Sequence, residues 1–216
     1  MTDDTIRIGV VGAGGNTQIR HIPGFRTQEN VEVVSVCNRT RESSQRIASK
    51  FEIPRIYDTW KDLVEADDID AVCIGTWPYL HAPITIAALE AGKHVLTEAR
   101  MALNAHEARA MLTASRKKPS LVAQVVPAPL TFKVDATIRR LLAEGYVGDI
   151  LAIELRGIQN TFADSDSLLH WRQDSSLSGY NILNLGIWYE TLMRWVGPAR
   201  RVMAMTKVVV KKRYDQ

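Results

Sequence analysis

A glycine-rich stretch near the N-terminus has residue types and a spacing that suit phosphate binding. The apolar run 6–11 stops at Gly12 and Gly14, and Asn16 and Thr17 follow at the start of an expected helix. A strand that ends in glycines and turns directly into a helix brings main-chain N–H groups and the positive end of the helix dipole to one point. Gly12 would permit the tight turn, and Gly14 would let a pyrophosphate approach the main chain. These four residues are therefore candidate cofactor-binding residues.

The motif is imperfect, because Thr17 occupies its third glycine position. Glycine-rich turns join strands to helices in many folds, so a plain turn is the alternative. The context favours a nucleotide-binding loop: the motif follows the first expected strand, and a second strand at 31–37 completes a stretch of the length of a βαβ unit.

Residues after the second strand bear on the choice of cofactor. Asn38 stands where an acidic residue usually holds the ribose 2′-hydroxyl, and Arg39 and Arg41 follow it. Guanidinium groups bind phosphate well, whereas a carboxylate at this place would repel it. The pattern therefore favours NADP over NAD, with Asn38 and Arg39 as candidate cofactor-binding residues. The alternative is that the arginines only begin a solvated helix.

The elements around these residues alternate along the first part of the chain. Apolar or β-branched runs typical of buried parallel strands recur at 31–37, 71–75, 94–97 and 121–125. Helical patterns separate them at 17–26, 41–51, 59–64, 82–91 and after Asn104. This alternation predicts an α/β fold, with a Rossmann-like, doubly wound parallel sheet and a dinucleotide-binding domain over residues 1–125.

The pattern changes after residue 125. A helix is expected at 134–145, a half-exposed strand at 149–157, a long helix at 178–196 and a last strand at 201–212. Two strands and two helices leave both edges of a sheet without partners. Residues 126–216 therefore predict an incomplete α+β domain, either in a truncated chain or in one completed by a partner subunit.

Composition and charge favour an ordinary globular protein. The 216 residues include 27 Lys and Arg against 24 Asp and Glu, and six of the positive charges gather at 200–213, so we expect no nucleic-acid surface. Cys37 and Cys73 lie in apolar runs without metal-ligand spacing, which predicts core residues in a reducing compartment and no metal site. The acidic N-terminus and the absence of long apolar runs predict a cytoplasmic protein without membrane contact.

The stretch 75–100, GTWPYLHAPITIAALEAGKHVLTEAR, together with the opening glycine motif, resembles the Gfo/Idh/MocA family of NAD(P)-dependent oxidoreductases. Its most specific part is 88–98, and the resemblance covers the whole chain. It implies a Rossmann domain joined to a C-terminal α/β domain with an open, mostly antiparallel sheet, which is normally much longer in the family. We also expect a homo-oligomer formed through that sheet.

The resemblance implies further cofactor-binding residues. Thr76 and His81 lie on the family's T-P-N-x-x-H pattern, although Trp77 and Pro78 replace its Pro and Asn. Glu98 matches the Glu of the family's E-K-P motif, which lies near the nicotinamide side of the cofactor.

The departures from the family concern the proton-transferring residues. Ala99 and Arg100 stand at the Lys and Pro of E-K-P, and Asn184 and Trp188 align with the family's Asp and His on a long helix. General acid–base catalysis needs a titratable group within hydrogen-bond reach of the substrate, and alanine, amide and indole side chains offer none. The standard proton transfer of the family is therefore expected to be absent.

Other residues could carry out the proton transfer. Tyr180, His170 and Arg172 are the candidate catalytic residues, although His170 and Arg172 could simply order a loop. The leading prediction is an oxidoreductase that uses NADP (or NAD) on a sugar, a cyclitol or a related small polyol or carbonyl compound. The alternative is a catalytically silent dinucleotide-binding sensor or scaffold. A hydrolase that retains its cofactor, as some relatives do, is a third reading.

Overall fold

The computed structural model describes residues 5–127, 134–180 and 183–214. The chain divides into two compact units, each described here by itself. The first comprises Met1–Val126 and Asp174–Tyr180, and the second Pro127–Gln173 and Asn181–Gln216. The sequence does not foresee that a short late segment folds with the first unit, and the domain division at residue 125 stays a prediction.

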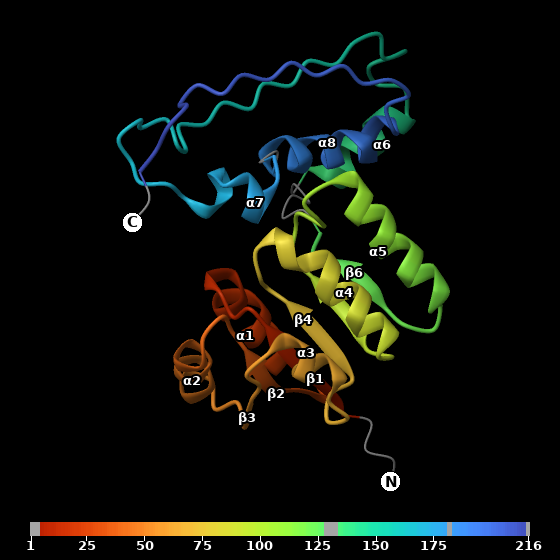
Figure 1. Cartoon of the computed structure of the whole chain (residues 1–216). Helices are drawn as coiled ribbons and strands as arrows, with labels where there is room; N and C mark the ends of the chain where they lie inside the picture. Colours follow the sequence, from red (N-terminus) through yellow and green to blue (C-terminus); the bar gives the residue numbers. More distant parts are fainter. Residues whose placement is uncertain (1–4, 128–133, 181–182, 215–216) are drawn as a thin grey trace. The chain divides into compact units, whose positions relative to one another are not determined.

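The first unit is built on a six-stranded sheet in the order β3-β2-β1-β4-β5-β6, with every pair of neighbouring strands parallel (Figure 1). The strands are β1 Ile6–Val11, β2 Val31–Cys37, β3 Arg55–Ile56, β4 Ala71–Ile74, β5 His94–Thr97 and β6 Ala123–Val125. The helices are η1 Thr17–His21, α1 Ile22–Arg26, α2 Arg41–Lys50, α3 Trp60–Glu65, η2 Pro78–Leu80, α4 His81–Glu90, α5 Ala105–Lys117 and α7 Ser175–Ser178. The predicted Rossmann-like fold is confirmed.

Helices cover both faces of this sheet. Successive residues of a strand point to opposite faces, so neighbouring residues pack against different helices. Val10 packs with Ile22 of α1 and Ile47 of α2 on one face. Val11 packs with Leu63 of α3 and Leu89 of α4 on the other. Burying a side chain of this size contributes roughly 1.5–3 kcal/mol, so the two clusters fix the carboxyl ends of the strands.

Short side chains determine where three of these helices begin. Thr40, Thr59 and Asn104 each accept a hydrogen bond from a main-chain N–H of the first turn, at 3.2, 3.1 and 3.0 Å. Such caps satisfy donors that lack a partner inside the helix. The capped start of α2 lies directly after β2, which places its first turn beside the glycine-rich loop.

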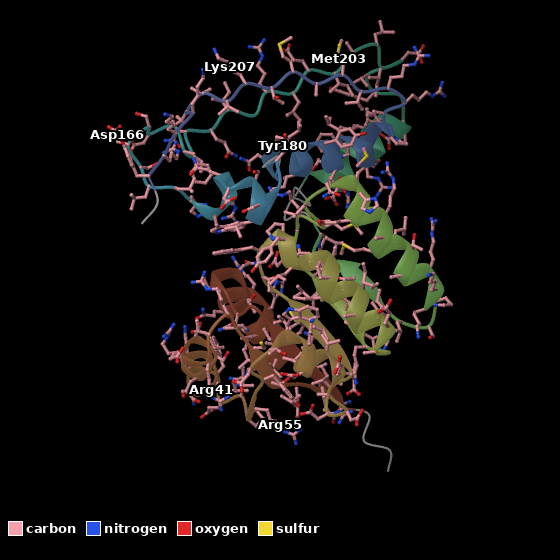
Figure 2. The ribbon with its side chains drawn as sticks, in the orientation of Figure 1. Arg41, Arg55, Asp166, Tyr180, Met203 and Lys207 are labelled. Atoms are coloured by element: carbon pink, nitrogen blue, oxygen red, sulfur yellow. The ribbon has the colours of Figure 1, made fainter. Side chains whose placement is uncertain are left out.

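The second unit differs from its prediction in its extended segments. Residues 149–157 and 201–212 are described, yet neither forms a strand. Leu151, Met203 and Met205 are 95%, 97% and 98% exposed, and Figure 2 labels Met203 and Lys207 on the later segment. A β-strand needs main-chain hydrogen bonds to a neighbouring strand, and none is found for these two segments among the described residues. The antiparallel sheet is therefore not observed, and the homo-oligomer through it stays a prediction.

The long helix expected at 178–196 is interrupted. Helix α7 ends at Ser178, and α8 spans Leu183–Val196, with residues 181 and 182 outside the described part of the chain. Gly179 has φ +60°, and a Cβ there would overlap the carbonyl oxygen of Leu103. This left-handed conformation ends α7, because a residue with a side chain would be strained at that position.

Within the second unit, α6 (Asp135–Ala143) is tied to α8, and a short η3 (Trp171–Gln173) lies between them in sequence. The Asp135 carboxylate accepts hydrogen bonds from Nη2 of Arg194 at 2.7 Å and from Nε1 of Trp195 at 2.8 Å. In the described part of the chain, none of the helices has the length and apolar character needed to cross a membrane.

Candidate cofactor site

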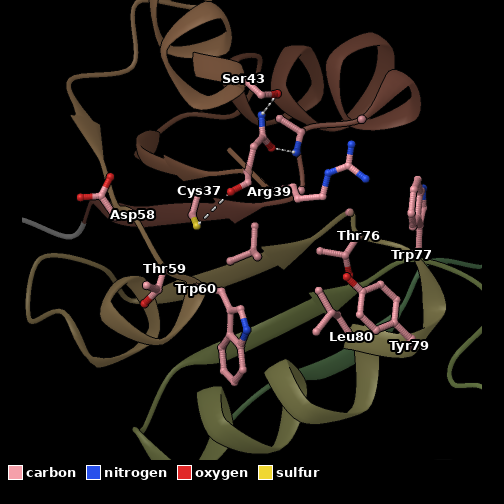
Figure 3. Close-up of a pocket in the computed structure, with 16 residues that line it drawn as sticks. Cys37, Arg39, Ser43, Asp58, Thr59, Trp60, Thr76, Trp77, Tyr79 and Leu80 are labelled. Atoms are coloured by element: carbon pink, nitrogen blue, oxygen red, sulfur yellow. Dashed lines mark hydrogen bonds between the residues drawn. The ribbon is translucent and has the colours of Figure 1, made fainter. Parts of the chain in front are cut away.

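A cavity of about 550 Å³ opens at the carboxyl ends of β1, β2 and β4 (Figure 3). Strand order reverses between β1 and β4, and ligands of open parallel sheets bind at such a switch point. The lining combines the glycine loop with polar and aromatic side chains, namely Val11, Gly12, Ala13, Gly14, Cys37, Asn38, Arg39, Ser43, Asp58, Thr59, Trp60, Gly75, Thr76, Trp77, Tyr79 and Leu80.

The glycine loop leaves room for an anion. Gly12 has φ +84°, and a Cβ there would lie 2.6 Å from the main-chain nitrogen of Thr76, so this position requires glycine. A Cβ on Gly14 would meet nothing closer than 3.8 Å, and one on Gly15 nothing within 4 Å. Among the described residues, the N–H groups of Gly15 and Asn16 have no hydrogen-bond acceptor. Open space with unpaired donors at a helix start fits a pyrophosphate.

Thr17 supports the loop from beneath. Its side chain is only 1% exposed, and its Oγ1 donates a hydrogen bond to the carbonyl of Gly12 at 3.2 Å. A Cβ on Gly75 would overlap that hydroxyl, so glycine in the facing segment compensates for threonine at the third motif position. Thr17 therefore orders the glycine loop, and its role in cofactor binding stays a prediction.

Asn38 also orders the loop. Its Oδ1 accepts a hydrogen bond from the Ala13 N–H at 2.7 Å, and its Nδ2 donates to Oγ of Ser43 at 3.1 Å (Figure 3). Its amide thus links the glycine turn to the first turn of α2. Arg41 forms an ion pair with Asp58 at the surface, whereas the guanidinium of Arg39 lies over the ring of Trp77.

Cys37 lines the same cavity but is not a nucleophile. Burial, with smaller contributions from the charges of Asp58 and Asp62, raises the pKa of its thiol to about 11. Only the thiolate is reactive, so the site offers no cysteine chemistry at neutral pH. Cys37 and Cys73 are both free and buried.

Glu98 directly follows β5, and two hydrogen-bond donors hold its carboxylate. Nε2 of His21 lies 2.6 Å from its Oε1, and Nδ2 of Asn16 donates to the same oxygen. Burial raises the pKa of Glu98, but these hydrogen bonds outweigh it, so the pKa falls below its usual value and the carboxylate stays ionised.

The start of the helix explains this arrangement. Its first turn, η1, is a π-turn in which the N–H of Ile22 bonds the carbonyl of Thr17, five residues back. Residues five apart are then aligned, so Asn16 and His21 both reach Glu98. His21 was not among the candidate residues of the sequence, because its alignment with Asn16 depends on the π-turn.

The remaining cofactor candidates have different surroundings. His81 is 1% exposed, and its ring nitrogens lie 2.7 and 2.9 Å from the carbonyl oxygens of Arg100 and Thr76. It lies outside the cavity lining and connects two loops; burial lowers its pKa. Thr76 lines the cavity, and its buried Oγ1 has no hydrogen-bond partner among the described residues.

The three candidate catalytic residues lie in different units. Tyr180 belongs to the first unit and is 88% exposed, whereas His170 and Arg172 belong to the second. Nδ1 of His170 accepts the Arg172 N–H at 3.2 Å, and the ring lies 5.2 Å from that of Phe162. Burial and the charge of Arg172 lower the pKa of His170, so its imidazole is neutral at pH 7. Their joint action stays a prediction.

The residues that the sequence comparison predicts to stand near the family's proton-transferring positions make structural contacts. Nδ2 of Asn184 donates to Oε1 of Gln159 at 2.6 Å, and a Cβ on Gly157 would lie 3.2 Å from Nε1 of Trp188. Nη2 of Arg100 donates to the carbonyl of Ser178 at 2.6 Å and so fixes α7 to the Rossmann unit. None of these side chains can exchange a proton at neutral pH.

Comparison with known proteins agrees with the fold and the loop. The model of the "Oxidoreductase family, NAD-binding Rossmann fold" matches residues 6–125, and that of the GFO/IDH/MocA C-terminal domain matches residues 136–215. Trans-1,2-dihydrobenzene-1,2-diol dehydrogenase from Bos taurus is 30% identical over 188 residues, 85% of this chain and 53% of that protein. Levoglucosan dehydrogenase from Pseudarthrobacter phenanthrenivorans is 32% identical over 142 residues, 66% of this chain and 36% of that protein.

A solved structure extends the likeness. Biliverdin reductase from Synechocystis sp. PCC 6803, in complex with biliverdin and NADP⁺, matches with a TM-score of 0.74 and 26% identity over 91% of this chain and 60% of that one. The fold and the glycine loop therefore define an NAD(P)-binding Rossmann protein. More specifically, the chain belongs to the Gfo/Idh/MocA family of oxidoreductases. It spans between 36% and 60% of the length of these relatives.

Proposed function

We propose that this protein is an NADP-preferring oxidoreductase that moves a hydride between the nicotinamide and a carbinol or carbonyl carbon of a sugar, cyclitol or small polyol. The observation that carries the proposal is the open glycine loop with unpaired N–H donors, beside which Asn16 binds the carboxylate of Glu98 after β5. Two relatives are named as a diol dehydrogenase and a levoglucosan dehydrogenase, which supports this substrate class.

Residues in and beside the cavity fit different parts of the cofactor. The N–H groups of Gly15 and Asn16 would bind the pyrophosphate, and Arg39 the 2′-phosphate. Because the two halves of a dinucleotide bind on opposite sides of the switch point, Glu98 after β5 belongs to the nicotinamide half. The bound nicotinamide supplies the hydride acceptor or donor.

Proton transfer needs a group outside the family's usual positions. His170 is neutral at pH 7 and can accept a proton, whereas the exposed hydroxyl of Tyr180 can donate one. The Arg172 charge stabilises the neutral imidazole beside it and would also stabilise an oxyanion. We propose that Tyr180 or His170 is the acid–base group, with Arg172 in support.

The test is NADP⁺ reduction by the 216-residue chain across a panel of sugars, cyclitols and small diols. We expect turnover to fall by about 10²–10⁴ in Tyr180→Phe or in His170→Ala, with NADPH affinity unchanged, because one positioned acid–base group is removed. Tyr146→Phe, an exposed tyrosine outside the cavity, is the matched control.

Turnover that survives in both variants would contradict the assignment of these residues. Tight NADPH binding without turnover of any compound would favour the silent sensor or scaffold over the oxidoreductase.

A further inference from the structure

Two loops meet across the mouth of the cavity. Arg39 follows β2 and Trp77 follows β4, and these strands lie on either side of β1. The loops therefore face one another over the glycine turn. The guanidinium carbon of Arg39 lies 5.7 Å from the centroid of the Trp77 ring, within the range of about 6 Å for a cation–π contact (Figure 3).

The main chain of Trp77 is conformationally restricted. Its main chain is extended, with φ −75° and ψ 156°, and the buried Pro78 that begins η2 restricts it to that region. The main chain of Trp77 is therefore restricted at the end of β4 and its indole is half-buried, while Arg39 is exposed and would otherwise sample many rotamers.

Stacking leaves the donors of Arg39 available. A guanidinium that lies over an aromatic face presents its five N–H groups in its own plane, where they can form a fork with a phosphate. The neighbouring candidates are already engaged, since the Asn38 amide binds Ala13 and Ser43, and Arg41 pairs with Asp58. Among the described lining residues, Arg39 is the one with a cationic side chain.

We infer that Trp77 is a positioning residue that holds Arg39 ready for the 2′-phosphate of NADP and so sets the preference for NADP over NAD. This inference rests on the proposed function. Its physical basis is preorganisation, because an arginine already ordered by stacking loses less rotamer freedom when it binds the phosphate. In the sequence, Trp77 stands out only as a departure from the family's T-P-N pattern.

The test is fluorescence titration of the full chain with NADPH and with NADH. In the unmodified protein we expect NADPH to bind about tenfold more tightly or better, as one charge-assisted phosphate contact provides. Trp77→Ala should lower that ratio about two- to fivefold, with NADPH affinity falling more than NADH affinity, since an exposed cation–π contact is of this size. Arg39→Ala should remove most of the preference, and Arg39→Ala with Arg41→Ala should erase it.

Two conservative variants test which property of each side chain matters. Trp77→Phe keeps an aromatic face and should retain the ratio, which also covers the case in which Trp77→Ala does not fold. Arg39→Lys keeps the charge but loses the planar fork, so the ratio should fall as in Trp77→Ala or further.

A ratio unchanged in Trp77→Ala, or an equal loss of both ligands, would overturn the inference while leaving the oxidoreductase proposal in place. Tighter NADH binding by the unmodified protein would also overturn it. Failure of both dinucleotides to bind the unmodified protein would overturn the proposed function itself, and the inference with it.

Discussion

Two neighbouring side chains position the carboxylate of Glu98. Both donors, Asn16 and His21, bind its Oε1. The carboxylate is 17% exposed and ionised, so it can accept a further hydrogen bond from a ligand. A hydroxyl or an amide of the nicotinamide half would satisfy it.

At the residue scale, we expect Glu98→Gln to weaken NADPH binding about tenfold, because a hydrogen bond to a charged group is lost. Binding of 2′,5′-ADP should not change, since this fragment lacks the nicotinamide half. His21→Leu should resemble Glu98→Gln, and His21→Gln, which keeps an N–H donor, should resemble the unmodified protein. Calorimetric titration measures each affinity, with Glu90→Gln on the exposed end of α4 as control.

Equal weakening of both ligands in Glu98→Gln would mean that Glu98 only maintains the fold, and would contradict this role. Gly12 could be read from the sequence because its φ of +84° restricts the residue type. The amide of Asn38 and the ring of His21 could not be placed from the sequence alone, because their partners lie 25 and 77 residues away in the chain.

At the element scale, the ends of the strands are tied by charges as well as by apolar packing. The Asp70 carboxylate, just before β4, accepts hydrogen bonds from N, Nε and Nη2 of Arg7 in β1, at 2.9, 2.9 and 2.8 Å. These bonds lower the pKa of Asp70 to about 2, although burial opposes the shift.

The stability of the fold should therefore depend on pH through Asp70. Its folded pKa lies below its unfolded value near 4, so the unfolded chain binds more protons in that window. The stabilisation is present above about pH 4 and is lost as the pH falls toward 2. Because both side chains are over a third exposed, we expect about 1 kcal/mol or less.

Urea unfolding of the unmodified protein and of Asp70→Asn at pH 7, 4 and 3 measures this effect. The variant should be less stable at pH 7, and the difference should shrink as the pH falls. Asp67→Asn, a nearby exposed carboxylate, is the control. A difference that is constant across the three pH values would contradict the assignment.

Element boundaries also show what sequence patterns can and cannot specify. The parallel strands were predictable, because strands buried on both faces require continuous apolar runs. The break between α7 and α8 was not, because it depends on Gly179 facing the carbonyl of Leu103, a tertiary contact. The π-turn of η1 could not be predicted either, because a one-residue change in hydrogen-bond spacing leaves the apolar pattern nearly unchanged.

At the scale of the whole molecule, the first unit matches its prediction far better than the second. The Rossmann unit buries its apolar residues within its own two layers. The alternating pattern at 149–157 suits a strand, but alternation specifies a strand only when a neighbour and a covering layer exist. The family match at 136–215 identifies the kind of domain without supplying those neighbours.

NADPH titration of Gly14→Val tests whether a nicotinamide dinucleotide binds over the glycine loop. A Cβ on Gly14 meets nothing closer than 3.8 Å, so the variant should fold, while its side chain fills the space that the pyrophosphate needs. Gly24→Val, where a Cβ meets nothing within 4 Å, is the control, and circular dichroism verifies both folds. We predict that NADPH affinity falls at least about a hundredfold in Gly14→Val and is unchanged in Gly24→Val, because only the first blocks the phosphate site. A folded Gly14→Val protein that binds NADPH as tightly as the unmodified chain would contradict the account.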